Sequence, residues 1–321
     1  MTSTAGYPPI ENHGLIGDLQ TSALVSTDGT VDWFCVPRFD SPSVFASLLD
    51  PERGGHLSVR PAESGYVTRQ LYLPGTPILI TRFMSPGGVG EVVDFMPVTG
   101  TQATDRHRLV RLVRVVRGRM RFVGELAPRF DYGRATHTTE VQNHCVVFRS
   151  DGATLHFLPV PPPEGPLVSQ DDVRIVGGDV HVTAVLSEGQ VGGMVLESGP
   201  TGPPVPVARE EIVRLFEETR DFWRRWLHQS TYTGRWREVV ERSAMTLKLM
   251  TYAPTGALVA APTMGLPEQV GGERNWDYRY TWIRDASFSV YALLGLGFTE
   301  EARGFLGWLG DRMAEAVDEA S

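Results

Sequence analysis

The residues best suited to do chemistry lie together in the segment 275–286, which reads N-W-D-Y-R-Y-T-W-I-R-D-A. It holds four aromatic side chains, two arginines and two aspartates within twelve residues. Aromatic rings stack on the apolar face of a sugar ring, and Arg and Asp supply the paired donors and acceptors that sugar hydroxyls need. This composition is typical of a carbohydrate-binding site. The leading candidates for substrate contacts are Tyr278, Trp282, Arg284 and Asp285.

The same segment also has a purely structural interpretation. Trp276, Tyr280 and Trp282 are equally suited to pack in a core at the start of a helix. In that case Asp285 would only cap the N-terminus of the helix, where a carboxylate is favoured. Residue types alone leave both interpretations open.

Two stretches of the chain resemble one known family. The run W-D-Y-R-Y-T-W-I-R-D resembles the first substrate-binding segment of the glucoamylase-type glycoside hydrolases, family 15. Residues 10–50, which begin I-E-N-H-G-L-I-G-D-L-Q-T-S-A-L-V-S-T-D-G, resemble the opening of the N-terminal domain in the trehalase-like subfamily. The run F-D-Y-G at 130–133 also resembles that domain. The resemblance covers nearly the whole chain and is thinner between about 150 and 205.

The resemblance implies both a fold and a reaction. The fold is an antiparallel β-sandwich followed by an (α/α)6 barrel, and the reaction is hydrolysis of an α-glucosidic bond with inversion and without an organic cofactor. Trehalose is the favoured substrate and maltooligosaccharides come next. Arg284 and Asp285 would hold hydroxyls of a terminal glucose, while Tyr278 and Trp282 would pack against its ring. The residues that would shape the same subsite are Trp276, Asp277 and Arg279.

Hydrolysis of a glycosidic bond needs two carboxyl groups, one as acid and one as base or nucleophile. In the family both are glutamates, and the resemblance places both downstream of T-W-I-R-D, beyond Ser321. We therefore expect this sequence to carry one wall of the glucosyl subsite without the catalytic pair. A self-contained pair would have to come from Glu268, Glu273, Asp277 and Asp285. A different class of function, a noncatalytic sugar-binding or structural fragment or a pseudoenzyme, is the alternative.

Bulk composition excludes several function classes. The 321 residues carry a formal net charge of -8, which argues against a nucleic-acid-binding surface because phosphate contacts need an excess of Lys and Arg. Cys35 and Cys145 are the only cysteines and lie far apart, and the eight histidines lack ligand spacing, so we expect neither a disulfide framework nor a metal site. With no signal peptide and no long apolar run, we expect a cytoplasmic protein that does not enter a membrane.

The pattern along the chain predicts strands first and helices afterwards. Residues 1–207 are predicted to form the sandwich, 208–231 a linking amphipathic helix, and 232–321 the start of the barrel. A hairpin is expected at 21–34, turning at Asp28-Gly29, because Asp-Gly favours tight turns. Further predicted strands are 65–73, 77–84, 91–96, 109–116, 141–148, 153–158 and 180–186. Further predicted helices are 234–251, one that starts near Asp285, and 299–317.

Two details of the pattern have structural consequences. Arginines recur about every third residue over 108–121, which on a strand sends them to opposite faces, so solvated or ion-paired side chains are expected rather than one basic patch. The linking helix carries Phe222, Trp223 and Trp226, which suit either a sugar platform or packing between domains, and packing is the favoured interpretation. About three of the twelve barrel helices fit in this length. Their uncovered apolar faces are expected to promote self-association.

Overall fold

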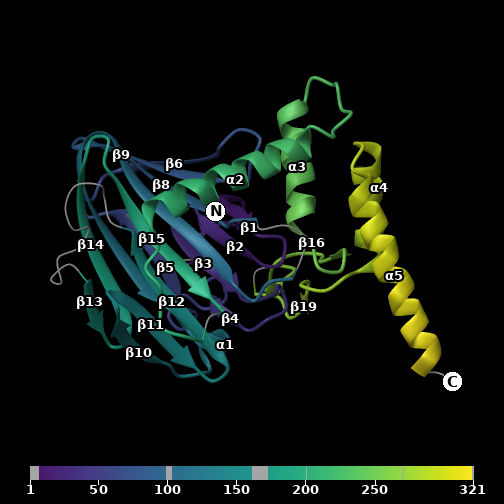
Figure 1. Cartoon of the computed structure of the whole chain (residues 1–321), viewed down its shortest axis with the longest axis horizontal. Helices are drawn as coiled ribbons and strands as arrows, with labels where there is room; N and C mark the ends of the chain where they lie inside the picture. Colours follow the sequence, from purple (N-terminus) through teal and green to yellow (C-terminus); the bar gives the residue numbers. More distant parts are fainter. Residues whose placement is uncertain (1–6, 99–102, 161–172, 200, 270, 320–321) are drawn as a thin grey trace.

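The structure, a computed structural model, describes residues 7–98, 103–160, 173–199, 201–269 and 271–319. Its first part is rich in strands and its last part is helical (Figure 1). A 3-10 turn spans Ile10–Asn12. The strands are β1 His13–Gly17, β2 Ser22–Ser26, β3 Thr30–Cys35, β4 Ser43–Phe45, β5 His56–Pro61, β6 Val67–Tyr72, β7 Leu79–Ser85, β8 Gly88–Phe95, β9 His107–Ala127, β10 Thr138–Gln142, β11 Cys145–Ser150, β12 Ala153–Val160, β13 Val173–Val176, β14 Asp179–Ser187 and β15 Val191–Ser198.

These 15 strands form one antiparallel network centred on β9. The first half of β9 pairs with β8 and β15, and its second half pairs with β5 and β14. The strand is therefore shared by two groups of strands. Its 21 residues, 107–127, begin 2 residues before the predicted 109–116 (109 minus 107) and end 11 residues after it (127 minus 116).

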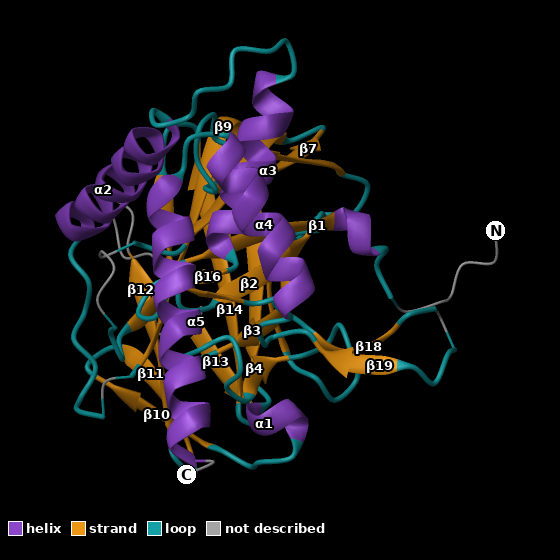
Figure 2. Ribbon diagram, turned by 90° about the vertical axis from the view of Figure 1, so that its right-hand side faces the viewer, coloured by secondary structure: helices purple, strands orange, loops and turns teal. Residues whose placement is uncertain are grey.

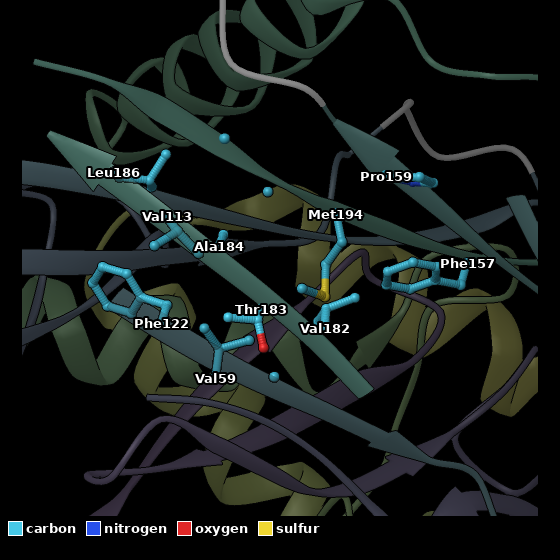
Figure 3. Close-up of a pocket in the computed structure, with 13 residues that line it drawn as sticks. Val59, Val113, Phe122, Phe157, Pro159, Val182, Thr183, Ala184, Leu186 and Met194 are labelled. Carbon is cyan, nitrogen blue, oxygen red and sulfur yellow. The ribbon is translucent and has the colours of Figure 1, made fainter. Parts of the chain in front are cut away.

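One hydrophobic core joins the two groups of strands. It combines Phe34 and Phe122 from one group with Phe83, Phe148 and Phe157 from the other, all almost fully buried. A cavity of about 40 Å³ remains inside this core, lined mainly by apolar side chains (Figure 3). Binding pockets for small molecules are about 300–1,000 Å³, so this cavity is a packing defect rather than a ligand site.

A fully buried ion pair ties several of these strands together. Arg111 of β9 donates through Nε to Asp94 Oδ1 of β8 at 2.7 Å, and both side chains are inaccessible to solvent. Its Nη1 donates to the carbonyl oxygens of Gly29 at 2.8 Å and Leu57 at 3.1 Å. Arg108 pairs with Glu197, so the expected ion pairing of this arginine run is confirmed at these positions.

A second buried pair joins β1 to β3. His13 Nε2 lies 2.7 Å from Asp32 Oδ2. Burial lowers the pKa of His13, but the hydrogen bond and negative charge of Asp32 outweigh it, so the net direction is upward. Burial also raises the pKa of Asp32, against the opposing effect of His13. Both shifts mean that the folded chain holds protons that the unfolded chain releases.

Because of this pair, the free energy of unfolding should fall as the pH rises. The contribution of His13 is complete below its unfolded value of 6.5 and is lost as the pH passes the higher folded pKa. We expect His13→Gln to flatten the fall in melting temperature between pH 6 and pH 9. His56→Gln is the matched control, because His56 faces Glu125 at 3.5 Å near the surface. An unchanged slope in His13→Gln would contradict this assignment.

Four helices follow the strands: α2 Arg209–Leu227, α3 Arg237–Leu249, α4 Ile283–Gly295 and α5 Thr299–Glu319. Two short hairpins lie between α3 and α4, namely β16 Thr251–Tyr252 with β17 Ala257–Leu258, and β18 Met264–Pro267 with β19 Asn275–Asp277. The start of α2 packs Ile212 and Leu215 against the strands, and its end buries Trp223 and Trp226 among the later helices. The expected packing role of both tryptophans is confirmed. In the view of Figure 2, α3, α4 and α5 lie in front of the strands.

The buried carboxylate of Glu301 lies at the centre of the helical cluster, and we call Glu301 with its partners Trp226 and Lys248 the hub. The ring of Trp226 stacks on that of Phe298 at 4.0 Å between centroids, and its Nε1 donates to Glu301 at 2.7 Å. Lys248 Nζ lies 2.8 Å from the same carboxylate oxygen. Glu301 is almost fully buried, and although burial raises its pKa, Lys248 and Trp226 outweigh that effect and lower it. The carboxylate thus joins α2, α3 and α5.

Leu19 connects the strands to this helical cluster. It follows β1, has a left-handed φ of 70°, and is completely buried among the helices. Its carbonyl accepts a hydrogen bond from the amide of Ala253 at 2.8 Å. Asp18 supports the turn, because its Oδ1 accepts from the amides of Gln20 and Thr21.

None of the helices in the described ranges is both long enough and apolar enough to cross a membrane.

Some predicted elements have different bounds. The predicted strand 141–148 is wrong as a single strand, because Asn143 and His144 have left-handed φ values of 50° and 61° and form the turn between β10 and β11. The hairpin at Asp28-Gly29 is confirmed, with Gly29 at φ 86° between β2 and β3. The run F-D-Y-G forms the short turn α1, Phe130–Gly133, in which Asp131 and Tyr132 are left-handed.

Candidate functional site

The candidate site lies where β19 leads into α4. We call residues 276–282 the site loop. β19 pairs with β18 before the site loop leaves the hairpin. The carbonyls of Tyr278 and Tyr280 then accept hydrogen bonds from the amides of Ala261 at 2.8 Å and Ala260 at 3.1 Å. The backbone of the site loop is therefore held along one edge before the helix begins.

Three aromatic rings of the site loop contact one another. Tyr278 stacks on Trp282 with centroids 5.6 Å apart and planes at 24°, and Trp276 meets Trp282 edge-on at 6.4 Å. Trp276 is 47% exposed and Trp282 36%, while Tyr278 is half-buried. These exposures contradict the interpretation as core aromatics. The rings form an accessible surface of the size and type that stacks on a sugar.

Arg284 and Asp285 follow directly in the first turn of α4. Arg284 Nη2 donates to Asp285 Oδ2 at 3.1 Å, and the two side chains are 75% and 41% exposed. A carboxylate is favoured at this position because the amides of the first turn give the helix a positive end. The pair therefore offers donors and acceptors to a ligand.

Arg279 is buried and lies apart from this exposed surface. Its Nε and Nη2 donate to Oδ1 and Oδ2 of Asp277 at 2.9 and 2.7 Å. Nη1 donates to the carbonyl of Ser41 at 2.8 Å and to the hydroxyl of Tyr132 at 2.7 Å. Burial raises the pKa of Asp277, but hydrogen bonds from Arg279 outweigh that effect and hold it below its usual range. The Asp277–Arg279 pair is therefore an anchor rather than a ligand surface.

A cavity of about 490 Å³ lies on another side of the site loop. It separates the loop from α5 and from the β16–β17 hairpin. The side chains that line it include Arg38, Asp40, Tyr252, Arg279, Tyr280 and Trp308. This space is large enough for a small molecule, but its most direct consequence is that the site loop is unsupported on that side.

The predicted site residues lie in or next to the site loop, whereas its supports come from elsewhere in the chain. The structure brings Trp276, Tyr278 and Trp282 into contact and places Arg284 and Asp285 in the adjoining helical turn. The supports from the N-terminal part, Ser41 and Tyr132, were not predicted as part of the site. The run F-D-Y-G resembles the N-terminal domain of the family, but nothing in the sequence shows that it faces residue 279.

Comparisons with known proteins agree with the resemblance. Residues 3–156 match the family described as trehalase-like, N-terminal, and residues 234–320 match glycosyl hydrolases family 15. The trehalase of Thermoplasma volcanium is 35% identical over 314 residues, which is 94% of this chain and 47% of that protein. The trehalase of Mycolicibacterium smegmatis is 35% identical over 322 residues, 95% of this chain and 47% of that protein.

The fold is similar to that of a bacterial glucoamylase whose structure was solved in complex with acarbose. The TM-score is 0.64 at 12% sequence identity, and the match covers 94% of this chain and 49% of the glucoamylase chain. This likeness bears on the fold alone: a domain rich in strands followed by helices. The chain spans about half the length of the relatives that it matches.

Proposed function

We propose that this chain, in which residues 3–156 match a trehalase-like N-terminal domain and residues 234–320 match glycosyl hydrolases family 15, provides the glucosyl-binding wall of a hydrolase that cleaves an α-glucosidic bond. The observation that carries the proposal is the exposed stack of Tyr278 on Trp282, followed at once by the Arg284–Asp285 pair. The rings pack against the apolar face of a glucose, and the charged pair binds its hydroxyls.

Trehalose is the substrate that we propose first. The relatives that match at about 35% identity are trehalases, and maltooligosaccharides are the second choice because residues 234–320 match the glucoamylase-type family 15. We also propose inversion, with a glutamate acid and a glutamate base supplied by the part of the family 15 domain that follows residue 321. The proposed division is 1–207, 208–231 and 232–321, with the last range as the start of an (α/α)6 barrel.

The apolar surface of α4 supports a larger helical assembly. Phe288 is 71% exposed, Tyr291 78% and Leu294 45%, all on this helix. Solvent-exposed clusters of large apolar side chains mark surfaces that another element covers. We propose that further helices of the family 15 domain cover them, and that the chain self-associates through this surface when they are absent.

Binding without hydrolysis is the second candidate function. Asp277 pairs with Arg279, Asp285 pairs with Arg284, and Glu268 lies 3.8 Å from Arg274. Hydrogen bonds from Arg279 hold the pKa of Asp277 below its usual range, so this carboxyl is a poor general acid. These contacts favour a sugar-binding role for this chain when it is separated from the rest of the domain.

Replacing Asp285 with asparagine should weaken glucose and trehalose binding by about 10-fold to 100-fold, because a hydrogen bond to a charged group contributes about 1.5–3 kcal/mol. The measurement is titration of the purified chain with each sugar, followed by NMR. The same samples show whether either sugar is hydrolysed and which anomer of glucose appears first.

Asp221→Asn is the matched control. Asp221 also pairs with a neighbouring arginine, Arg220, at 2.8 Å on an exposed helix surface, but it lies on α2 outside the site loop. Equal affinities in Asp285→Asn and the parent chain would remove Asp285 from the site. Turnover by the parent chain that Asp285→Asn abolishes would contradict the proposal that the catalytic carboxyls lie elsewhere.

A further inference from the structure

We infer that Arg279 is a positioning residue through which Tyr132 and Ser41 of the N-terminal part fix the orientation of the Tyr278–Trp282 stack. This inference rests on the proposed function and adds to it a role for the strand-rich part of the chain. The trehalase-like domain would then do more than cover the helices, because it would set the geometry of the sugar platform.

The first step is the pairing of Asp277 with Arg279 through three hydrogen bonds. The backbone amide of Arg279 donates to Asp277 Oδ1 at 3.0 Å, and its guanidinium binds both carboxylate oxygens. These two residues flank Tyr278 in the sequence. Bidentate pairing between a guanidinium and a carboxylate fixes both direction and distance. The backbone on both sides of Tyr278 is therefore held in one conformation.

The second step is the reach of Nη1 into the strand-rich part. It donates to the carbonyl of Ser41 and the hydroxyl of Tyr132, with a weaker contact at 3.4 Å to the carbonyl of Phe39. Ser41 and Tyr132 are 238 and 147 residues away along the chain. Arg279 is 6% exposed, so these contacts are shielded from water. They connect the site loop to Ser41 and Tyr132, and Tyr132 is held in place by contacts of its own.

Tyr132 is itself held in place. Its amide donates to Ser43 Oγ at 3.2 Å, and its backbone is left-handed with φ 58°. Its hydroxyl accepts from Arg279 and donates to the carbonyl of Ser41 at 3.4 Å. Burial raises the pKa of Tyr132 to about 12, which keeps this hydroxyl protonated and able to donate. A left-handed tyrosine persists only where its surroundings enforce it.

The third step is the lack of side-chain packing beyond Arg279. The cavity of about 490 Å³ borders Arg279 and Tyr280 on one side and Trp308 and Tyr252 on the other. The site loop is therefore positioned by the contacts of Arg279 together with the backbone hydrogen bonds from Ala260 and Ala261. A change at Tyr132 should therefore loosen the site loop even though the mutated residue contacts no sugar.

Tyr132→Phe tests this coupling, since it removes one hydroxyl and keeps the ring. Hydrogen exchange of the 321-residue chain, measured by mass spectrometry on peptides that span 276–282, should become about tenfold faster, the effect of losing one hydrogen bond to a charged group. Glucose binding, measured by NMR titration, should weaken by a similar factor. Arg279→Lys should give the same two changes, because lysine lacks the planar fork.

Tyr72→Phe is the matched control for general destabilisation. The hydroxyl of Tyr72 accepts from the amide of Leu15 at 2.7 Å and donates to its carbonyl at 3.1 Å, within the strand-rich part. This variant should lower the melting temperature without changing exchange at 276–282. The inference is overturned if exchange at 276–282 is unchanged in Tyr132→Phe and Arg279→Lys, or if it rises equally in Tyr72→Phe. A parent chain that binds neither glucose nor trehalose overturns the proposed function instead, and exchange still decides the role of Arg279.

Discussion

Arg111→Met is expected to lower the free energy of unfolding by about 3–5 kcal/mol, the typical cost of removing one partner of a buried ion pair. The substitution leaves Asp94 fully buried without its cation and removes the donor to the carbonyls of Gly29 and Leu57. Burial already raises the pKa of Asp94 against the effect of Arg111, so the carboxyl should take up a proton in the variant. Urea denaturation of the purified chain, followed by circular dichroism, measures the loss.

The double variant Arg111→Met with Asp94→Leu is the informative control. If the loss of stability comes from leaving the Asp94 carboxylate buried without a partner, replacing both partners with apolar side chains should recover most of the stability. Arg114→Met offers a surface comparison, because Arg114 also pairs with a buried carboxylate, Glu91, but is 46% exposed itself. A single Arg111→Met variant that loses less than about 1 kcal/mol would place this pair among the weak surface ion pairs.

Trp226→Ala should lower the free energy of unfolding by about 3–5 kcal/mol, the range for truncating a large aromatic side chain in a core. It removes the ring that stacks on Phe298 and the donor to Glu301. Because Lys248 alone then pairs with the buried carboxylate, α2, α3 and α5 lose their common contact. Urea denaturation gives the total, and hydrogen exchange shows whether the helices open before the strands.

Two variants separate the contributions. Trp226→Phe keeps an aromatic ring against Phe298 and removes only the indole donor, so its loss should be smaller. Trp236→Ala removes the same kind of side chain from a position that is 59% exposed, where the cost should be within about 0.5 kcal/mol. Equal losses in Trp226→Ala and Trp236→Ala would show that the hub at Glu301 does not hold the helices together.

The order of the elements could be predicted from local patterns, but the length and pairing of β9 could not. The spacing of apolar residues located α2, and Asp-Gly located the turn at Gly29, because both signals act within a few residues. The pairing of β9 with β5, β8, β14 and β15 depends on contacts between residues far apart in sequence. The turn at Asn143 and His144 was not predicted either, because neither of these left-handed residues is a glycine.

The candidate site was predictable where its residues are neighbours in the sequence. Tyr278, Trp282, Arg284 and Asp285 lie within eight positions, so the motif alone placed them together. The direction of Arg279 was not predictable, because its partners Ser41 and Tyr132 come from the other end of the chain. Local sequence identifies which residue types are present, whereas the side of the backbone that each one faces follows from the packing of distant elements.

The central position of β9 also has a consequence during synthesis. The strand is complete at Ala127, with β5 and β8 already available as neighbours, but β15 ends only at Ser198. These 71 residues (198 minus 127) take roughly 4–14 s to emerge at about 5–20 residues per second. For those seconds the edge of β9 that pairs with β15, residues 107–114, has no partner from its own chain, and an unpaired edge is a template for pairing between molecules. The nascent chain is therefore exposed to aggregation through this edge until β15 has emerged.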